Sequence, residues 1–254
     1  MTDVLTHTEG GVTTLTLNRL AAKNALTSAM YATLADALSA AATDPAQRVV
    51  VIQGHASVFT AGNDIGDFLN TPPTDTDAPV HRFLQLLVTF PKPLLAAVCG
   101  PAVGVGTTML LHCDLVYAGD NAMFALPFVN LGLCPEAGSS LLMARLMGHQ
   151  RAAQALLLGD PFTAEAALEV GLINSVLPPT EVTAYTQRQA QRLAAKPADA
   201  LMESKRLMKA PVTQGIRDAM DSENEVFRRL LTEPAAKEAF SAFLEKRAPD
   251  FKQL

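Results

Sequence analysis

The apolar pattern of the chain changes near residue 178, and this change limits the folds that the chain can adopt. Before that point, short aliphatic and β-branched runs alternate with stretches of helical periodicity. Residues 12–17 nearly alternate between apolar and polar, which is typical of a strand, and residues 49–52 are apolar at every position, which is typical of a strand buried on both faces. The first part of the chain is therefore predicted to alternate strands and helices around a buried sheet.

The last part of the chain has a purely helical pattern. We expect no strand after about residue 178, and residues 181–247 have the pattern of successive helices separated near Pro197, Pro211 and Pro234. Strand–helix alternation followed by helices alone predicts an α/β fold with two regions. These are a core over residues 1–195 and a helical extension over residues 196–254.

Local signals place further elements along the chain. Thr27 is a suitable N-cap for a helix whose apolar residues recur every four positions. Residues 94–98 and 115–117 are expected to be buried strands, and residues 69–79, rich in Thr, Pro and Asp, are expected to form a mobile loop before a helix over residues 81–90. Helices are expected from Ser139 onward, with Thr163 as an N-cap and with ends at Gly148, Gly159 and Gly171.

Charge and cysteine content exclude several classes of protein. The 254 residues include 20 Lys and Arg against 25 Asp and Glu, a formal net charge of −5, which argues against a nucleic-acid partner. The three cysteines form no CxxC pair and the five histidines form no HExxH motif, so no metal site is expected. Without a disulfide framework or a signal-peptide pattern, the cytoplasm is the favoured compartment.

One stretch is long and apolar enough to raise the question of a membrane span. No charged residue occurs between Lys92 and Asp114. The stretch nevertheless contains two prolines, three glycines and the polar residues Thr107, Thr108 and His112. We therefore expect a buried strand, a glycine-rich turn and the start of a helix there, and no membrane span.

Two glycine-containing turns follow expected buried strands, at residues 59–65 (FTAGNDI) and at residues 100–106 (GPAVGVG). Glycine lets the backbone approach a ligand closely, and a helix that starts after such a turn presents free N–H groups. Two such turns, brought together, could supply a pair of donors to a developing oxyanion. Either turn alone is also compatible with an ordinary tight turn.

The order and spacing of these motifs resemble the crotonase superfamily of enoyl-CoA hydratases and isomerases over nearly the whole chain. The matching segments are LNR at residues 17–19 with NAL at 24–26, both glycine turns, CDL at 113–115 and AFLEKR at 242–247. The resemblance implies the crotonase-like spiral of β-β-α units with an all-helical C-terminal extension. It also implies an acyl-CoA thioester substrate, so that coenzyme A is part of the substrate and no cofactor is expected.

The same resemblance assigns roles by motif position. It implies that the backbone N–H groups of Asn63 and Val105 polarise the thioester carbonyl and form an oxyanion hole, and that a helix beginning near Gly106 adds its positive end. The other residues that it implies in binding the substrate are Ala22, Ala61, Gly62, Asp64, Ile65, Gly104, Phe128, Phe243 and Lys246.

The acidic residues favour one reaction of this family. Hydratases resembling this chain use two glutamates to activate water, and this chain has Thr108 and Phe128 at those positions. One acid, Glu136, lies in an apolar neighbourhood, where burial would raise its pKa toward the range of a general base. From the residues alone, Glu136 is also compatible with a carboxylate in the first turn of the helix before Ser139.

Pro135-Glu136 followed by Ser139-Ser140 is similar to the peroxisomal-type Δ3,Δ2-enoyl-CoA isomerases, in which a lone glutamate acts at this place. The predicted reaction is therefore the shift of the double bond of a 3-enoyl-CoA to give the 2-enoyl-CoA, with Glu136 moving a proton from C2 to C4. A dienoyl-CoA isomerase, a weak enoyl-CoA hydratase, a non-catalytic acyl-CoA-binding protein and a helical scaffold are the alternatives.

The C-terminal region carries a further implication of the resemblance. Family members form trimers, often paired into hexamers, so a homotrimer or a dimer of trimers is expected. Phe243 and Lys246 match positions that reach the coenzyme A of a neighbouring subunit. Gly66 stands where family members often carry a lysine for the nucleotide phosphates, and Leu20 replaces a usual proline.

Overall fold

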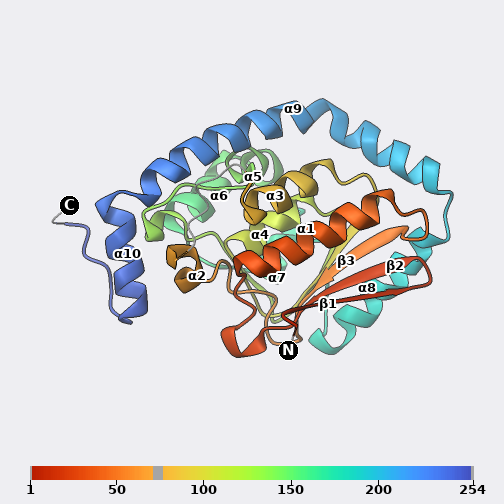
Figure 1. The fold of residues 1–254 in the computed structure, drawn as a ribbon, viewed down its shortest axis with the longest axis horizontal. Helices are drawn as coiled ribbons and strands as arrows, with labels where there is room; N and C mark the ends of the chain where they lie inside the picture. Colours follow the sequence, from red (N-terminus) through yellow and green to blue (C-terminus); the bar gives the residue numbers. More distant parts are fainter. Residues whose placement is uncertain (1, 71–76, 253–254) are drawn as a thin grey trace.

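The computed structural model describes residues 2–70 and 77–252. In this part of the chain the main sheet contains β1 (Val4–Glu9), β2 (Val12–Leu17), β3 (Val49–Gln53), β4 (Leu94–Val98), β6 (Leu115–Gly119) and β9 (Ser175–Leu177). They lie in the order β1-β2-β3-β4-β6-β9, and Figure 1 shows the first three strands side by side. β1 pairs with β2 in antiparallel orientation and every other neighbouring pair is parallel.

Helices cover both faces of this sheet. α1 (Ser28–Thr43) and α3 (Pro79–Thr89) pack on one face, in a core that includes Val50 and Ile52 of β3. The alternate residues Val49 and Val51 point to the other face and pack against α8 (Pro179–Ala194). The uninterrupted apolar run of β3 is therefore buried on both faces, as predicted.

A second, smaller sheet gives the fold its spiral. It consists of β5 (Pro101–Val103), β7 (Met123–Ala125) and β8 (Phe162–Thr163). β5 follows β4 and β7 follows β6 almost directly, so these two main-sheet strands continue into the second layer before a helix begins. Thr60, after β3, joins the second layer through a bridge to Ala102. This arrangement confirms the predicted mixed α/β architecture.

The sequence signals for helix ends are confirmed. The Thr27 hydroxyl accepts the N–H of Met30 at 3.3 Å, and Thr163 caps α7 (Ala164–Glu169) in the same way. Gly148, Gly159 and Gly171 all have positive φ at the ends of helical segments. The other helices and helical turns are η1 (Leu20–Ala22), α2 (Ile65–Asn70), α4 (Val105–Thr108), η2 (Met109–His112), η3 (Val129–Leu131), α5 (Ser139–Met147), α6 (His149–Ala153) and the π-helical η4 (Gln154–Leu158).

The C-terminal region is helical, but the predicted break at Pro211 is wrong. α9 (Ala198–Leu231) runs through Pro211 and forms the long curved helix at the top of Figure 1, before α10 (Pro234–Leu244). Proline deprives the carbonyl of Leu207 of its helical donor. The Leu207 side chain is 62% exposed, so water can reach this turn and the helix bends without ending. The boundary drawn at residues 195–196 falls in the turn between α8 and α9.

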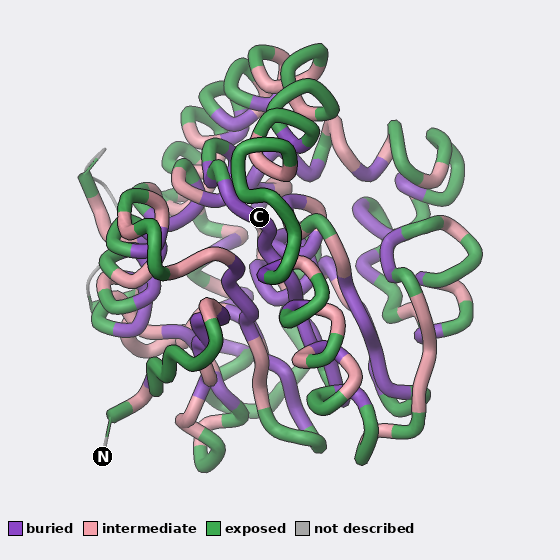
Figure 2. Tube along the Cα trace, turned by 90° about the vertical axis from the view of Figure 1, so that its right-hand side faces the viewer, coloured by how far each residue is buried: buried purple, intermediate pink, exposed green. Residues whose placement is uncertain are grey.

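Other parts of the structure add to the sequence analysis. β1 is a strand that the sequence pattern does not indicate, because only Val4 of its residues is buried and the strand shows no alternation. Of the loop expected at residues 69–79, Leu69 lies in α2 and Pro79 begins α3, and residues 71–76 lie outside the described residues. The apolar stretch between Lys92 and Asp114 divides into β4, β5, α4 and η2, and Figure 2 shows long buried segments in the strands at the centre of the molecule.

In the described part of the chain, none of the helices combines the length and the hydropathy that a bilayer crossing requires.

Candidate active site

The two glycine turns lie side by side, as the sequence predicted. The N–H of Val103 donates to the Thr60 carbonyl at 3.0 Å, and the N–H of Thr60 donates to the Pro101 carbonyl at 3.0 Å. Gly62 has φ +91°, and a Cβ at this position would lie 2.8 Å from the Val103 carbonyl oxygen. Glycine is therefore needed at Gly62 both for its backbone angle and for the close approach of the second turn.

The N–H groups of Asn63 and Val105, one on each turn, are available as donors. Neither donates a backbone hydrogen bond within the described residues, whereas the neighbouring N–H groups of Asp64 and Gly104 bond to the carbonyls of Leu26 and Ala125. Val105 is the first residue of α4, where an N–H has no acceptor inside the helix. The helix expected to begin near Gly106 is α4, which has only four residues before η2 begins, so the contribution of its dipole is small.

Buried polar contacts fix the first turn against the rest of the fold. The Asn24 side chain accepts the N–H of Arg19 at 2.9 Å and donates to the Phe59 carbonyl at 3.1 Å. The Thr60 hydroxyl donates to the Asn24 carbonyl at 2.6 Å and accepts the N–H of Gly62 at 3.1 Å. These contacts explain why the LNR and NAL segments belong to the same motif as the glycine turn.

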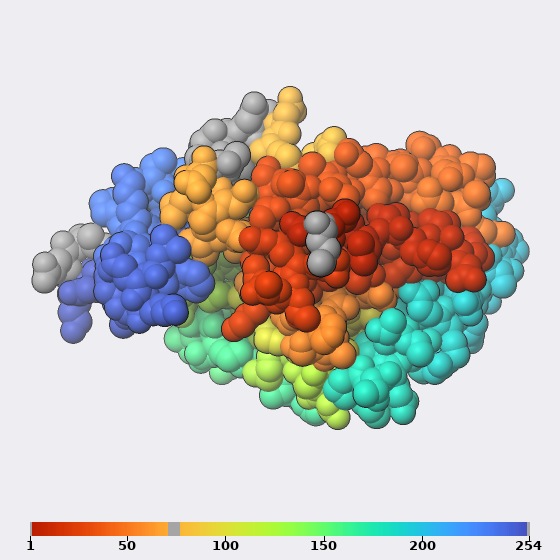
Figure 3. Space-filling model, turned by 60° about the horizontal axis from the view of Figure 1, so that its bottom comes forward, coloured from red at the N-terminus to blue at the C-terminus, as the bar shows by residue number. Residues whose placement is uncertain are grey.

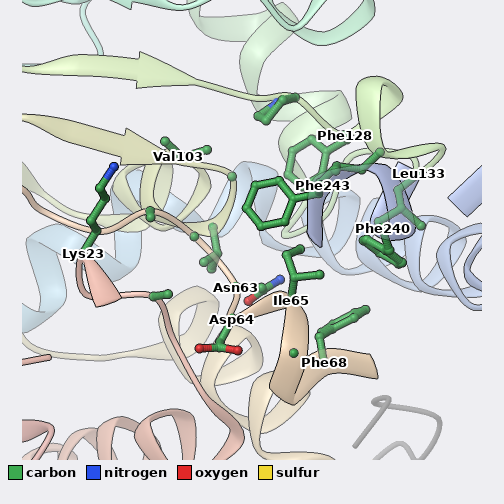
Figure 4. Close-up of a pocket in the computed structure, with 18 of the residues that line it drawn as sticks. Lys23, Asn63, Asp64, Ile65, Phe68, Val103, Phe128, Leu133, Phe240 and Phe243 are labelled. Carbon is green, nitrogen blue, oxygen red and sulfur yellow. The ribbon is translucent and has the colours of Figure 1, made fainter. Parts of the chain in front are cut away.

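A pocket of about 760 Å³ opens beside the two turns. Figure 4 shows Lys23 at one end and Phe128, Phe243 and Ile65 at the other. Of the predicted site residues, those that line this pocket are Ala22, Ala61, Gly62, Asn63, Asp64, Ile65, Gly104, Val105, Phe128 and Phe243. Lys246 and Glu136 are not among the described residues that line it.

Aromatic side chains from distant segments close the pocket on one side. Phe68 of α2 contacts Phe227 of α9 and Phe240 of α10, with ring centroids 6.2 and 6.3 Å apart. Figure 3 shows the C-terminal residues in blue beside the orange residues near α2. Phe243, which was expected to reach a neighbouring subunit, lines the pocket of its own chain and is 60% exposed.

Asp64 is the carboxylate in the pocket wall, and its oxygens are already engaged. Its Oδ1 accepts the N–H of Asp67 at 2.9 Å, and its Oδ2 lies 2.6 Å from Nη1 of Arg19. The hydrogen bond from Asp67, followed by the Arg19 guanidinium, lowers the pKa of Asp64 despite partial burial. An ionised carboxylate held in this way orients the turn and is a poor proton acceptor.

Glu136 has the opposite environment. It lies between η3 and α5, is 6% exposed, and its Oε1 accepts no hydrogen bond from the described residues. Burial, and to a lesser extent the negative charge of Glu223, raises the pKa of Glu136 to about 8. A carboxyl group with this pKa can take up and release a proton near neutral pH. Because α5 begins at Ser139, Glu136 is not in the first turn of that helix, the alternative that its position also allowed.

Tyr31 interacts both with the turn that carries Asn63 and with the charge of Glu136. The buried Tyr31 hydroxyl donates to Oδ1 of Asn63. Burial, and to a lesser extent the charge of Glu136, raises the pKa of Tyr31 well above its ordinary value. Glu136 itself is not among the described residues that line the pocket of Figure 4.

The two positions compared with hydratase glutamates are both buried and uncharged. Thr108 is fully buried in α4, and its hydroxyl donates to the Val105 carbonyl at 3.5 Å. Phe128 is 5% exposed and its ring borders the pocket. Neither side chain can take a proton from water near neutral pH.

Several pocket residues carry no signal in the sequence. Lys23, an exposed cation in a left-handed turn at φ 51°, lines the pocket although only its neighbours belong to a motif. Phe68, Phe227 and Phe240 are far apart in the chain, and only the fold brings them together. No group of three or more His, Cys, Asp or Glu residues suited to a metal ion occurs in residues 2–70 and 77–252.

Comparisons with known proteins identify the family to which the chain belongs. The family model described as enoyl-CoA hydratase/isomerase matches residues 7–254. The 2,3-dehydroadipyl-CoA hydratase of Escherichia coli (strain K12) is 36% identical over 99% of this chain and 99% of its own length. Enoyl-CoA delta isomerase 2 of Rattus norvegicus is 36% identical over 81% of this chain and 54% of its own length.

The solved structure of OdaA from Pseudomonas aeruginosa superposes with a TM-score of 0.94, at 48% identity, over 96% of this chain and 99% of that chain. The chain belongs to the enoyl-CoA hydratase/isomerase family.

Proposed function

We propose that the protein is an isomerase that converts a 3-enoyl-CoA into the 2-enoyl-CoA. The observation that carries this proposal is the contrast between the two acids near the site. Asp64 is ion-paired with Arg19 and its pKa is lowered, whereas Glu136 is buried, has an oxygen without a hydrogen bond from the described residues, and has a pKa raised to about 8. Environments that push two carboxyl pKa values apart indicate which one exchanges protons.

The proposed reaction needs one base and two fixed donors. The thioester carbonyl accepts hydrogen bonds from the N–H groups of Asn63 and Val105. The ionised carboxylate of Glu136 removes a proton from C2, and the electron pair of the C–H bond becomes part of a dienolate whose negative charge rests mainly on the thioester oxygen. The protonated Glu136 then returns the same proton to C4, so that the double bond moves to C2–C3 and the carboxylate is regenerated.

Access to Glu136 sets a condition on the substrate. Glu136 does not line the pocket, so in the proposed reaction the acyl chain extends past Asn63 to bring C2 and C4 to its carboxylate. The wall on this path is apolar, with Phe128, Leu133 and Ile65 at its surface. An apolar wall keeps water away from the unsaturated chain and so disfavours hydration.

The coenzyme A part of the substrate is proposed to lie toward the opposite end of the pocket. Lys23 supplies a cation there, in a chain whose net charge of −5 otherwise repels phosphate groups. Lys246 remains a candidate for a contact with the coenzyme A of a neighbouring subunit, in a homotrimer or a dimer of trimers. Sedimentation of the purified protein measures that assembly directly.

The function is tested by replacing Glu136 with glutamine and following the conversion of 3-enoyl-CoA to 2-enoyl-CoA. Loss of the general base is expected to lower kcat by roughly 10²–10⁴, with the binding of a saturated acyl-CoA little changed. Glu225→Gln, at an exposed position on α9, is the matched control and keeps the wild-type rate. An unchanged kcat in Glu136→Gln refutes the assignment of the base.

Two further assays separate the alternatives. Exchange of the C2 hydrogen with deuterated water is expected in the wild-type protein, and its absence would identify a protein that only binds acyl-CoA. With 2-enoyl-CoA as substrate, we expect hydration to be much slower than isomerisation. Hydration at a comparable or higher rate would contradict the proposal and favour a hydratase, the activity in the name of the Escherichia coli relative.

A further inference from the structure

Glu223 is a buried carboxylate in the middle of the long helix α9, with only 7% of its surface exposed. Its Oε2 accepts the N–H of Gly138 at 2.6 Å. Its Oε1 accepts the N–H of Ser140 at 2.9 Å and also the Ser140 hydroxyl. The N–H groups at the start of α5 have no acceptor inside that helix, so Glu223 satisfies them from a different element. These contacts tie α9 to the backbone just after Glu136.

The backbone that follows Glu136 has an unusual conformation. Ala137 has φ +60°, in the left-handed region that residues with a Cβ seldom adopt, and it is almost completely buried. Nε2–H of His112 donates to the Ala137 carbonyl at 2.8 Å. On the other side, the hydrogen bonds of Glu223 hold Gly138 and Ser140. The segment that carries Glu136 is therefore fixed between two anchors, and the anchor on α9 is a carboxylate.

The hydrogen bonds decide which of the two carboxyl groups keeps its charge. Glu223 accepts three hydrogen bonds, whereas Oε1 of Glu136 accepts none from the described residues. Hydrogen bonds to a carboxylate stabilise its ionised form. Burial raises the pKa of Glu223, but these hydrogen bonds oppose that rise, so Glu223 ionises before Glu136 and its negative charge opposes the ionisation of Glu136.

The other titratable groups that face Glu136 carry no charge near neutral pH. Burial raises the pKa of Tyr31, on α1, and raises the pKa of Cys134, in the loop of Glu136 itself, to about 11. Burial lowers the pKa of His112, on η2, to about 4. Among the described residues around Glu136, the charge that acts on its carboxyl group is therefore that of Glu223 on α9.

We propose that Glu223 is a positioning residue of this site, which holds the backbone of Glu136 through Gly138 and Ser140 and whose fixed negative charge makes Glu136 a stronger base. The catalytic part of this inference rests on the proposed function, in which Glu136 is the base. The electrostatic part concerns the protein alone and is measurable without a substrate.

The test compares Glu223→Gln with wild type in two independent measurements. Infrared difference spectra across a pH titration report the proton on Glu136, with Glu136→Gln used to assign its carboxyl band. The pH profile of kcat for 3-enoyl-CoA reports the same group during turnover. In Glu223→Gln we expect the pKa of Glu136 to move from about 8 toward its ordinary value of 4.5, and the acid limb of the kcat profile to move with it. The plateau of kcat falls roughly three- to tenfold, because a weaker base removes the C2 proton more slowly.

Glu223→Asp separates charge from position. It keeps the carboxylate but shortens its reach to Gly138 and Ser140, so we expect the pKa of Glu136 to stay near 8 while kcat falls. Glu225→Gln removes a charge from an exposed position of the same helix and leaves both readouts unchanged. Circular dichroism verifies that each variant is folded. If Glu223→Gln does not fold, the comparison of Glu223→Asp with wild type decides the case. A fall in the pKa of Glu136 in Glu223→Asp overturns the proposal, because that variant keeps the carboxylate.

A Glu223→Gln protein in which Glu136 titrates as in wild type overturns the electrostatic inference, because a purely structural residue would not move that titration. Failure of the proposed function is recognised separately. In that case the wild-type protein does not isomerise 3-enoyl-CoA, while the infrared titration still shows whether Glu223 controls the proton on Glu136.

Discussion

The raised pKa of Glu136 makes a specific prediction about the stability of the protein. In the folded chain the carboxyl group keeps its proton up to about pH 8, whereas in the unfolded chain it loses the proton near the ordinary pKa of 4.5. Between these values the folded state binds one more proton than the unfolded state. The free energy of unfolding therefore decreases as the pH rises through this window, and it stops decreasing above the folded pKa. Glu136→Gln cannot ionise, so this contribution is absent from the variant.

The size of the effect follows from the two pKa values. One pH unit corresponds to about 1.4 kcal/mol for a single proton, so the whole window corresponds to about 5 kcal/mol. Between about pH 5.5 and 7.5, the unfolding free energy of Glu136→Gln should therefore rise relative to that of wild type by roughly 3 kcal/mol. Any fixed gain or loss from the amide cancels in this comparison, because only the change with pH is used.

The assay is urea unfolding of both proteins at matched concentrations across this pH range. The chain has no tryptophan, so far-ultraviolet circular dichroism is the suitable probe. The reasoning predicts that the two stability curves diverge as the pH rises. Curves that stay parallel over this range would show that Glu136 is already ionised in the folded protein, and this result would refute its assignment as a proton-exchanging group.

Two further variants test the paired glycine turns. Val105→Pro removes the N–H at the first position of α4, where proline is tolerated, and is expected to lower kcat by about 10²–10³, whereas Val105→Ala keeps the N–H and most of the rate. A rate in Val105→Pro equal to that of Val105→Ala would contradict the oxyanion role. Gly62→Ala places a Cβ 2.8 Å from the Val103 carbonyl at φ +91°, so we expect a loss of about 1–3 kcal/mol in stability and a lower kcat. Gly10→Ala, at φ +56° with no atom within 4 Å of its Cβ, has the backbone strain without the clash and should keep the wild-type kcat.

The elements that the sequence predicted well are those with a strong local signal. The run of residues 49–52 could be assigned to a doubly buried strand because its neighbours on both faces are apolar. Thr27 and Thr163 could be assigned as caps because a hydroxyl that accepts an N–H three residues on is a local contact. β1 escaped prediction since its residues are mostly exposed, and Pro211 was misinterpreted because bending of an exposed helix depends on solvent access that local sequence does not show.

The candidate site divides in the same way. The turns around Gly62 and Gly104 were found from their motifs, and the structure brings them together as expected. Glu223 was not found, because it lies in a polar stretch of α9 beside Asp221 and Glu225, where a glutamate has the pattern of a solvated helix face. Its burial against the start of α5 is a property of the packing between distant elements, and this packing follows only from the fold.

The electrostatics of the site resolve an apparent conflict between the acidic chain and an anionic substrate. The net charge of −5 would oppose both the binding of acyl-CoA and the formation of an enolate. Near the proposed reaction centre, however, Arg19 neutralises Asp64, and the donors left for the substrate oxygen are backbone N–H groups without a formal charge. The buried carboxylate of Glu223 is held by Gly138 and Ser140, and its proposed role is to make Glu136 a stronger base. The position of each charge therefore matters more than their sum, and an acidic chain can stabilise a developing anion.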